Sequence, residues 1–210
     1  MLLGGDRRAR RVVTVDELVR VLAHDGILLV QDATRPSVAT SIAGAPIRGS
    51  WWGHPKSKQI FDALGALDEH ADVAIAKLID GKNTLIHRRL WPALVAIGRA
   101  RAPWQLDGLS ATALALLDQL EDGPRRGGGA PGKELEARLL ARGRQLHTDA
   151  GSHVTELTAW SGFARAEKLR APPLETAYAA FEEALWPAAD RLPWRPRAPS
   201  LRRKPGEVDG

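Results

Sequence analysis

The residues with the greatest capacity for chemistry lie in one short segment. His147 and Asp149 are two positions apart, and His153 and Glu156 follow beyond a glycine. Imidazole and carboxylate groups exchange protons near neutral pH and also bind divalent metals. Structural roles compete with these, because Asp149 or Ser152 can cap a helix and the histidines can bond to nearby backbone. We therefore treat His147, Asp149, His153 and Glu156 as candidate catalytic residues and assign no metal.

The surrounding pattern predicts the elements that must position this segment. A helix over 110–120, with Leu114, Leu117 and Leu120 facing inward, precedes a flexible Gly/Arg loop over 123–132. A helix over 133–142 and an extended segment over 143–151 follow, and Ser152 opens another helix that runs to 168. Two helices followed by an extended wing is the order of a winged helix-turn-helix, in which the second helix enters the major groove.

Several segments also resemble a known group of proteins. They are SWW (50–52), KLIDGKNTL (77–85), LWPAL (90–94) and HTDAGSH (147–153), and the likeness spans roughly residues 50–165. They are similar to uncharacterised bacterial proteins with winged-helix character, some of which are grouped with winged-helix DNA glycosylases. The resemblance implies a winged-helix fold and DNA as partner. Gln105-Leu106-Asp107 has the form of the glycosylase motif but lies outside the matched segments, so we do not carry its role over.

The first half of the chain carries signals of its own. Thr14 and Glu17 form a capping-box pattern, which predicts a helix that Gly26 ends. A helix after Pro55 should carry Ile60, Phe61, Leu64 and Leu67 inward. Asp80-Gly81 separates two β-like runs and predicts a hairpin over 73–87. A link near 99–108 then leads to the second half.

Charge is concentrated at the two ends. The 210 residues include 30 Lys and Arg against 25 Asp and Glu, a net charge of +5. The ends 1–12 and 189–210 are rich in arginine, and we expect both to be disordered and able to contact phosphates. The absence of cysteine excludes disulfides and thiolate metal sites. No apolar run approaches the roughly 18 residues of a membrane span, so we expect no membrane partner and a cytoplasmic protein.

Basic and aromatic residues supply the candidate nucleic-acid contacts. Trp52 and Lys56 lie in a mixed aromatic and basic segment that suits base stacking, and Arg88 and Arg89 precede a helix N-terminus. Each has a structural alternative, as a core residue or as solvated surface. The full set of candidates is Trp52, Lys56, Arg88, Arg89, Arg125, Arg126, Lys133, Arg138, Arg142, Arg144, His147 and His153.

These observations predict an α+β, mostly helical protein with two small lobes. We expect residues 1–12 to be a basic arm, 13–104 a first lobe with a hairpin, 105–188 a winged-helix-like second lobe and 189–210 a Pro/Arg-rich tail. The leading hypothesis is binding of double-stranded DNA through phosphate contacts, with no cofactor. A glycosylase-like repair enzyme remains an alternative, although the sequence favours binding. A protein-interaction module, built on a helix over 174–186 and the Pro-rich tail, is the second alternative.

Overall fold

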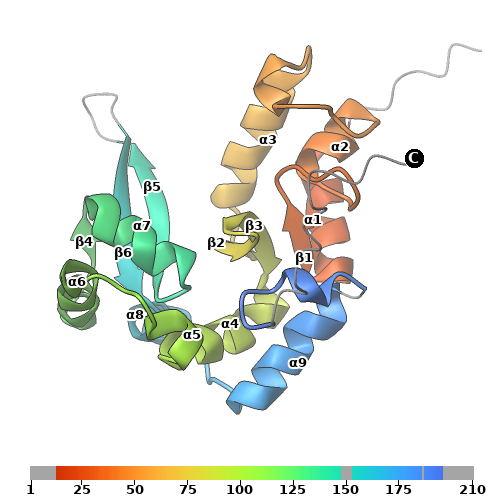
Figure 1. The fold of residues 1–210 in the computed structure, drawn as a ribbon. Coiled ribbons are helices and arrows are strands. Elements are labelled where there is room, and N and C mark those ends of the chain that lie inside the picture. The colour runs from red at the N-terminus through yellow and green to blue at the C-terminus, as the bar shows by residue number, and fades with distance from the viewer. Residues whose placement is uncertain (1–12, 148–152, 186, 196–210) are drawn as a thin grey trace, which may run out of the picture.

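The computed structural model describes residues 13–147, 153–185 and 187–195, which fold as two lobes on a shared helical base (Figure 1). The α+β class and the mostly helical content are confirmed. In Figure 1 the first lobe is red to yellow, the second is green to cyan, and helices α4 and α9 lie beneath them.

The first lobe is a three-stranded antiparallel sheet covered by helices. Thr14 caps α1 (Val15–Asp25) with the predicted capping box, and Gly26 ends it in the left-handed conformation. The sheet has the order β1-β3-β2 and the predicted hairpin joins its last two strands. The remaining elements are β1 (Ile27–Leu29), α2 (Val38–Ala43), η1 (Trp51–Gly53), α3 (Ser57–Asp68), β2 (Val73–Ile79) and β3 (Lys82–His87).

The two faces of this sheet contact different helices. Leu28, Val73 and Leu85 pack with the buried residues of α1, α2 and α3. Ala74, Leu78 and Ile86 pack against the base. The base consists of η2 (Arg88–Leu90), α4 (Trp91–Arg99), α5 (Pro103–Leu106), α8 (Trp160–Ala166), α9 (Leu174–Leu185) and η3 (Ala189–Arg191).

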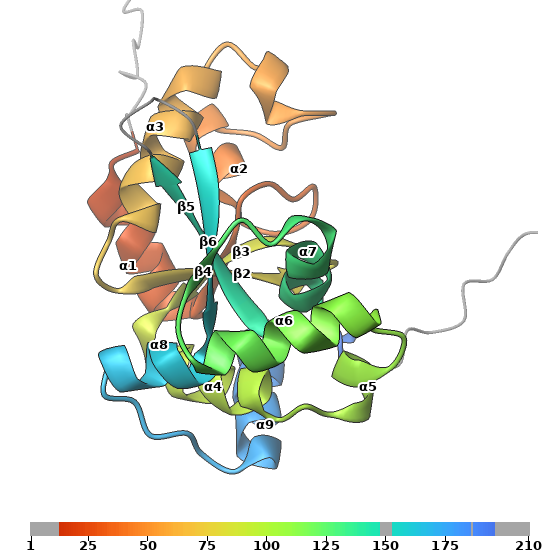
Figure 2. The same ribbon diagram turned by 90° about the vertical axis from the view of Figure 1, so that its left-hand side faces the viewer.

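The second lobe has the order helix, short strand, helix, hairpin. Its elements are α6 (Ala111–Glu121), β4 (Arg125–Arg126), α7 (Gly129–Ala137), β5 (Ala141–His147) and β6 (His153–Ala159). The sheet order is β4-β6-β5, so the short first strand pairs with the last one. Leu117, Leu135 and Leu157 belong to the core that joins α6 and α7 to one face of this sheet. Figure 2 shows α6 and α7 beside the upright β5–β6 hairpin.

The sequence interpretation of this lobe was wrong at several places. The helix expected over 152–168 is a strand to Ala159, because β-branched Val154, Thr155 and Thr158 suit a pleated ladder with β5. The helix expected over 133–142 begins at Gly129 and ends at Ala137. Leu114 was expected in the core but is 42% exposed. The expected Gly/Arg loop contains β4 and the start of α7.

A close approach between α4 and α8 ties the second lobe to the base. Trp160 is 1% exposed, and its indole Nε1 donates to the carbonyl of Leu139 at 2.8 Å. A Cβ on Gly98 of α4 would overlap the indole ring of Trp160. Only glycine at position 98 therefore permits the two helices to pack at this distance.

The C-terminal segment folds back on both the base and the first lobe. Residues 189–195 were expected to belong to a disordered tail, but Leu192 is buried and Trp194 stacks on Tyr178 at 4.8 Å. The apolar residues of α9, Ala177 and Phe181 among them, lie in the same core. The apolar face proposed for a protein partner is therefore occupied within the chain, and the tail beyond Arg195 lies outside the described residues.

Arg191 joins this segment to the first sheet. Its Nη2 lies 2.6 Å from Asp32 Oδ2 and 2.8 Å from Asp80 Oδ2. Burial alone would raise the pKa of Asp32, but hydrogen bonds from Arg191 and Thr34 outweigh it and hold that pKa far below its ordinary value.

We predict that Gly98→Ala destabilises the protein by about 2 kcal/mol, because the added methyl group must displace the buried Trp160 ring. Gly65→Ala on α3 is the matched control, since a Cβ there has open space. It should be neutral or stabilise by up to about 1 kcal/mol through helix propensity. Urea denaturation measures both, and equal stability of the two variants would contradict the packing argument.

We predict that Arg191→Met lowers the free energy of unfolding by about 1–2 kcal/mol near neutral pH. The pKa of Asp32 is lower in the folded state, so its contribution is complete above about pH 4 and is lost as the pH falls further. The difference between parent and variant should therefore narrow below about pH 4. Arg195→Met, which removes a more exposed ion pair with Glu182, should have the smaller effect at neutral pH.

Candidate nucleic-acid interface and interlobe groove

The β5–β6 hairpin sorts its residues onto two faces. Gly143 pairs with Leu157, and both lie on the face that carries α6 and α7. Arg144 pairs with Glu156, and Arg142 pairs with Thr158, on the opposite face. We call this opposite side the outer face of the second sheet.

Three exposed arginines follow the edge and the outer face. In the ladder, Arg126 of β4 and Arg144 of β5 both pair with Glu156 of β6, so the three residues are neighbours across the strands and share the outer face. Arg125 precedes Arg126 on the edge strand β4 and pairs with Leu157, so it lies at the sheet edge on the other face. Within the described part of the chain, these arginine side chains form no ion pair or hydrogen bond. We call Arg125, Arg126 and Arg144 the sheet arginines, and they are available for phosphate contacts.

Arg142 has a different environment from the one expected of an exposed phosphate contact. Its guanidinium lies over the Phe163 ring at 4.9 Å, and its buried Nε has no hydrogen-bond partner among the described residues. Burial, followed by the charge of Arg144, lowers the pKa of Arg142. The side chain is therefore a partly buried, incompletely satisfied charge.

Helix α7 presents few side chains to a major groove. Glu134 accepts bonds from the backbone and hydroxyl of Ser110 at the start of α6. Glu136 accepts from Lys77 of β2 at 3.1 Å and therefore faces the first lobe. Lys133 is exposed and is the one basic residue within α7. The amino-acid sequence predicted that this helix reads the base sequence of DNA. Few of its side chains are free to make such base contacts.

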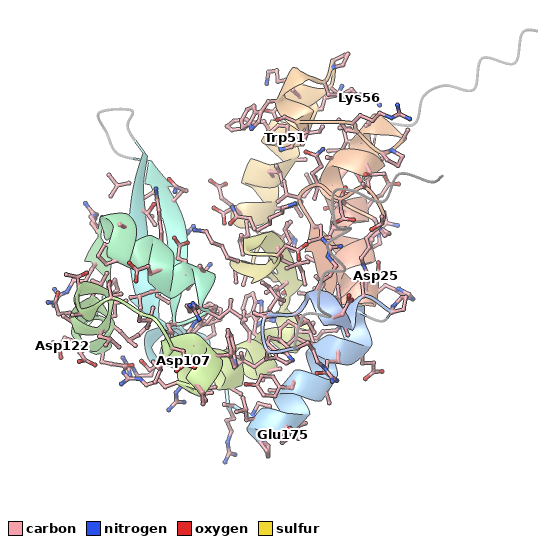
Figure 3. All side chains as sticks on the ribbon, viewed as in Figure 1. Asp25, Trp51, Lys56, Asp107, Asp122 and Glu175 are labelled. Carbon is pink, nitrogen blue, oxygen red and sulfur yellow. The ribbon has the colours of Figure 1, made fainter. Side chains whose placement is uncertain are left out.

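Four other candidates are engaged in structural contacts. Lys56, at the upper end of the first lobe in Figure 3, donates to the carbonyl of Ile42 at 2.6 Å. Arg138 donates to the carbonyl of Trp104, Arg88 pairs with Asp72 at 2.9 Å, and Arg89 donates to the carbonyl of His24. These contacts hold loops and helix ends, so each of the four positive charges has a structural role that requires no bound ligand.

Of the candidate catalytic residues, Glu156 lies within β6 and pairs with Arg144 of β5. His147 and His153 are register partners in β5 and β6, whereas Asp149 and both histidine side chains lie outside the described residues. The acid–base hypothesis thus stays a prediction from sequence. Among the described side chains, no group of three or more potential ligands is arranged to hold a metal ion.

Gln105 has a structural role. It is fully buried, its Oε1 accepts from the backbone of Ala102 at 2.9 Å, and its Nε2 donates to the carbonyl of Arg138 at 3.1 Å. The bond to Ala102 caps α5, and the bond to Arg138 fixes α5 against the C-terminal end of α7. They account for this residue by packing and leave no free amide group for a reaction.

A groove of about 840 Å³ separates the two lobes. Its walls come from η1, α3 and β2 on one side and from α7 and the hairpin on the other. We call it the interlobe groove; its lining includes Trp52, Phe61, Lys77, Lys133, Gln145 and Thr155. A second cavity of about 980 Å³ adjoins it and reaches Lys82 and Arg191. The two share the lining residues Trp51, Leu64, Ile75 and Asn83, and we call the groove and this adjoining cavity together the hollow.

Sequence patterns anticipated only part of this groove. Phe61 was expected to face the core but is 53% exposed, because Ile60, Ala63 and Leu67 form the buried face of α3. Trp52 is 62% exposed, whereas its neighbour Trp51 is 8% exposed. The signal that could have identified Phe61 as exposed is the strict spacing of Ile60, Ala63 and Leu67, which leaves position 61 off the buried stripe.

Comparison with protein-family models, with curated proteins and with solved structures gives no match for this chain. The resemblance inferred from the sequence segments therefore stays a prediction. Separately, none of the helices in the described ranges is both long and apolar enough to cross a membrane.

We predict that Arg142→Met stabilises the protein by about 1 kcal/mol, because methionine keeps the contact with Phe163 and removes a partly buried, incompletely satisfied charge. Arg144→Met, at an exposed position on the same strand, should change stability by less than about 0.5 kcal/mol. Chemical denaturation compares them. A large loss of stability in the Arg142 variant would show that its charge is satisfied in solution.

Proposed function

We propose that this protein binds double-stranded DNA through the sheet arginines, with little dependence on base sequence. The observation that supports this most directly is the row formed by Arg126, Glu156 and Arg144 across three paired strands. Strand pairing fixes the spacing of the two backbone positions, so both arginines can reach phosphates without a rearrangement of the main chain. Arginine also forms paired hydrogen bonds with phosphate oxygens.

The connectivity of the second lobe supports the same proposal. A helix, a short edge strand, a second helix and a hairpin follow in order, with the edge strand paired to the last strand. In winged-helix proteins the hairpin is the wing that touches the DNA backbone. By its place in this order, α7 corresponds to the helix that contacts bases in winged-helix proteins. Its glutamates, however, are engaged with Ser110 and Lys77. Phosphate contacts should therefore provide most of the affinity.

The test replaces the sheet arginines together, as Arg125→Gln, Arg126→Gln and Arg144→Gln. We expect the parent to bind a blunt duplex with the dissociation constant of non-specific complexes, about 10⁻⁴–10⁻⁶ M. The triple variant should bind more weakly at low salt. The slope of log K against log salt should fall by about 0.9 for each phosphate that the variant no longer neutralises. Fluorescence anisotropy at several salt concentrations gives both quantities.

A control variant with the same change in net charge separates a local contact from bulk electrostatics. Arg20→Gln, Arg99→Gln and Arg170→Gln remove three exposed arginines outside the second sheet. This variant should keep nearly all of the parent's affinity and salt slope. Equal reductions of affinity in the two triple variants would reject the sheet arginines as the binding surface, and a parent without affinity for duplex would reject the proposal.

A further inference from the structure

We propose that the interlobe groove binds unpaired nucleobases of a single-stranded segment by stacking on Trp52 and Phe61. The inference rests on the proposed function for the delivery of nucleic acid to the hairpin, but it concerns a separate surface. Gln145 lines the groove, whereas its neighbour Arg144 lies on the outer face. One hairpin therefore separates a surface for phosphates from a groove for bases.

The aromatic wall of the groove is a preorganised platform. Trp52 stacks on the nearly buried Trp51, with ring centres 4.0 Å apart and planes at 24°. Phe61 lies 5.8 Å from Trp52. Figure 3 shows Trp51 at the upper end of the first lobe, beside α3. Because Trp51 supports one face of the Trp52 indole, the ring gives up little motion when a base covers exposed aromatic surface.

The polar groups of the groove suit the edges of bases. Asn83 is exposed and lines both parts of the hollow. The Gln145 amide nitrogen donates to Thr155 Oγ1 at 2.9 Å, which leaves its carbonyl oxygen as an acceptor. Side-chain amides pair with the donors and acceptors of base edges. The aromatic faces and these amides together fit a planar ring with a polar rim.

The charge of the groove favours bases over a continuous run of phosphates. Glu136 and Lys77 neutralise one another at 3.1 Å, and Asp68 adds a further carboxylate to the lining. Lys133 and Lys82 pair with no carboxylate among the described residues. They lie in different parts of the hollow, Lys133 in the groove and Lys82 in the adjoining cavity. Stacking should therefore dominate the affinity of this site, and its salt dependence should be weak.

The experiment compares a short blunt duplex with the same duplex carrying a single-stranded thymidine extension. The parent should bind the extended duplex about tenfold more tightly, the gain expected for one stacked base. Trp52→Ala with Phe61→Ala should abolish this gain and leave the affinity for the blunt duplex unchanged. Trp52→Phe should keep most of the gain, because a ring remains at that position. The gain should change little between low and high salt.

The matched control is Val21→Ala with Leu114→Ala, which removes two exposed apolar side chains outside the groove. It should keep the full preference for the extended duplex. Three results would overturn this inference. The parent could bind both probes equally, the preference for the extension could survive in the Trp52 and Phe61 double variant, or the preference could disappear at high salt. Duplex binding by the sheet arginines would stand in each of these cases. The triple variant of the sheet arginines could lose affinity for the blunt duplex and still bind the extended duplex more tightly than the blunt one. This result would support the two surfaces independently.

Discussion

The contact between Gly98 and Trp160 sets the relation between the two lobes. Trp160 follows β6 directly and donates its indole hydrogen to Leu139, which leads into β5. Both ends of the second sheet's hairpin are thus fixed to one buried ring, and that ring packs on α4 without an intervening side chain. The Lys77–Glu136 pair makes a second contact nearer the groove. Since these contacts lie at and near the base, the upper parts of the lobes remain apart and bound a groove.

The arginines of this chain divide by environment more than by sequence position. Arg191 bridges two aspartates and holds the C-terminal segment, and Arg138 holds a helix end through a carbonyl group. Arg142 is packed on an aromatic ring. The sheet arginines contrast with these, because they lie on paired strands and their side chains form no ion pair with the rest of the described chain. Several arginines thus support the fold, whereas the sheet arginines are the exposed ones to which we assign the proposed phosphate contacts.

Local signals predicted the first lobe well and the second lobe poorly. The Thr14 capping box and the Asp80-Gly81 hairpin depend on neighbouring residues, so sequence alone identified them. Strand β6 depends on pairing with β5, and its Val154–Thr158 run resembles a helix in sequence because the following Trp160–Ala166 helix extends the same apolar pattern. The roles of Arg142 and Phe61 depend on tertiary packing. The sequence therefore identified which basic and aromatic residues could form the candidate site. The structure was needed to show which of them are exposed and which are engaged in packing.

The two proposed surfaces place opposite physical demands on one hairpin. Phosphates require exposed positive charge, whereas stacked bases require a groove of low net charge with exposed rings. A β-strand meets both demands because alternate residues point to opposite faces, as Arg144 and Gln145 do on β5. A helix in the same position would spread these residues around its surface. The hairpin therefore explains how a phosphate surface and a base-binding groove can lie within one residue of each other along the chain.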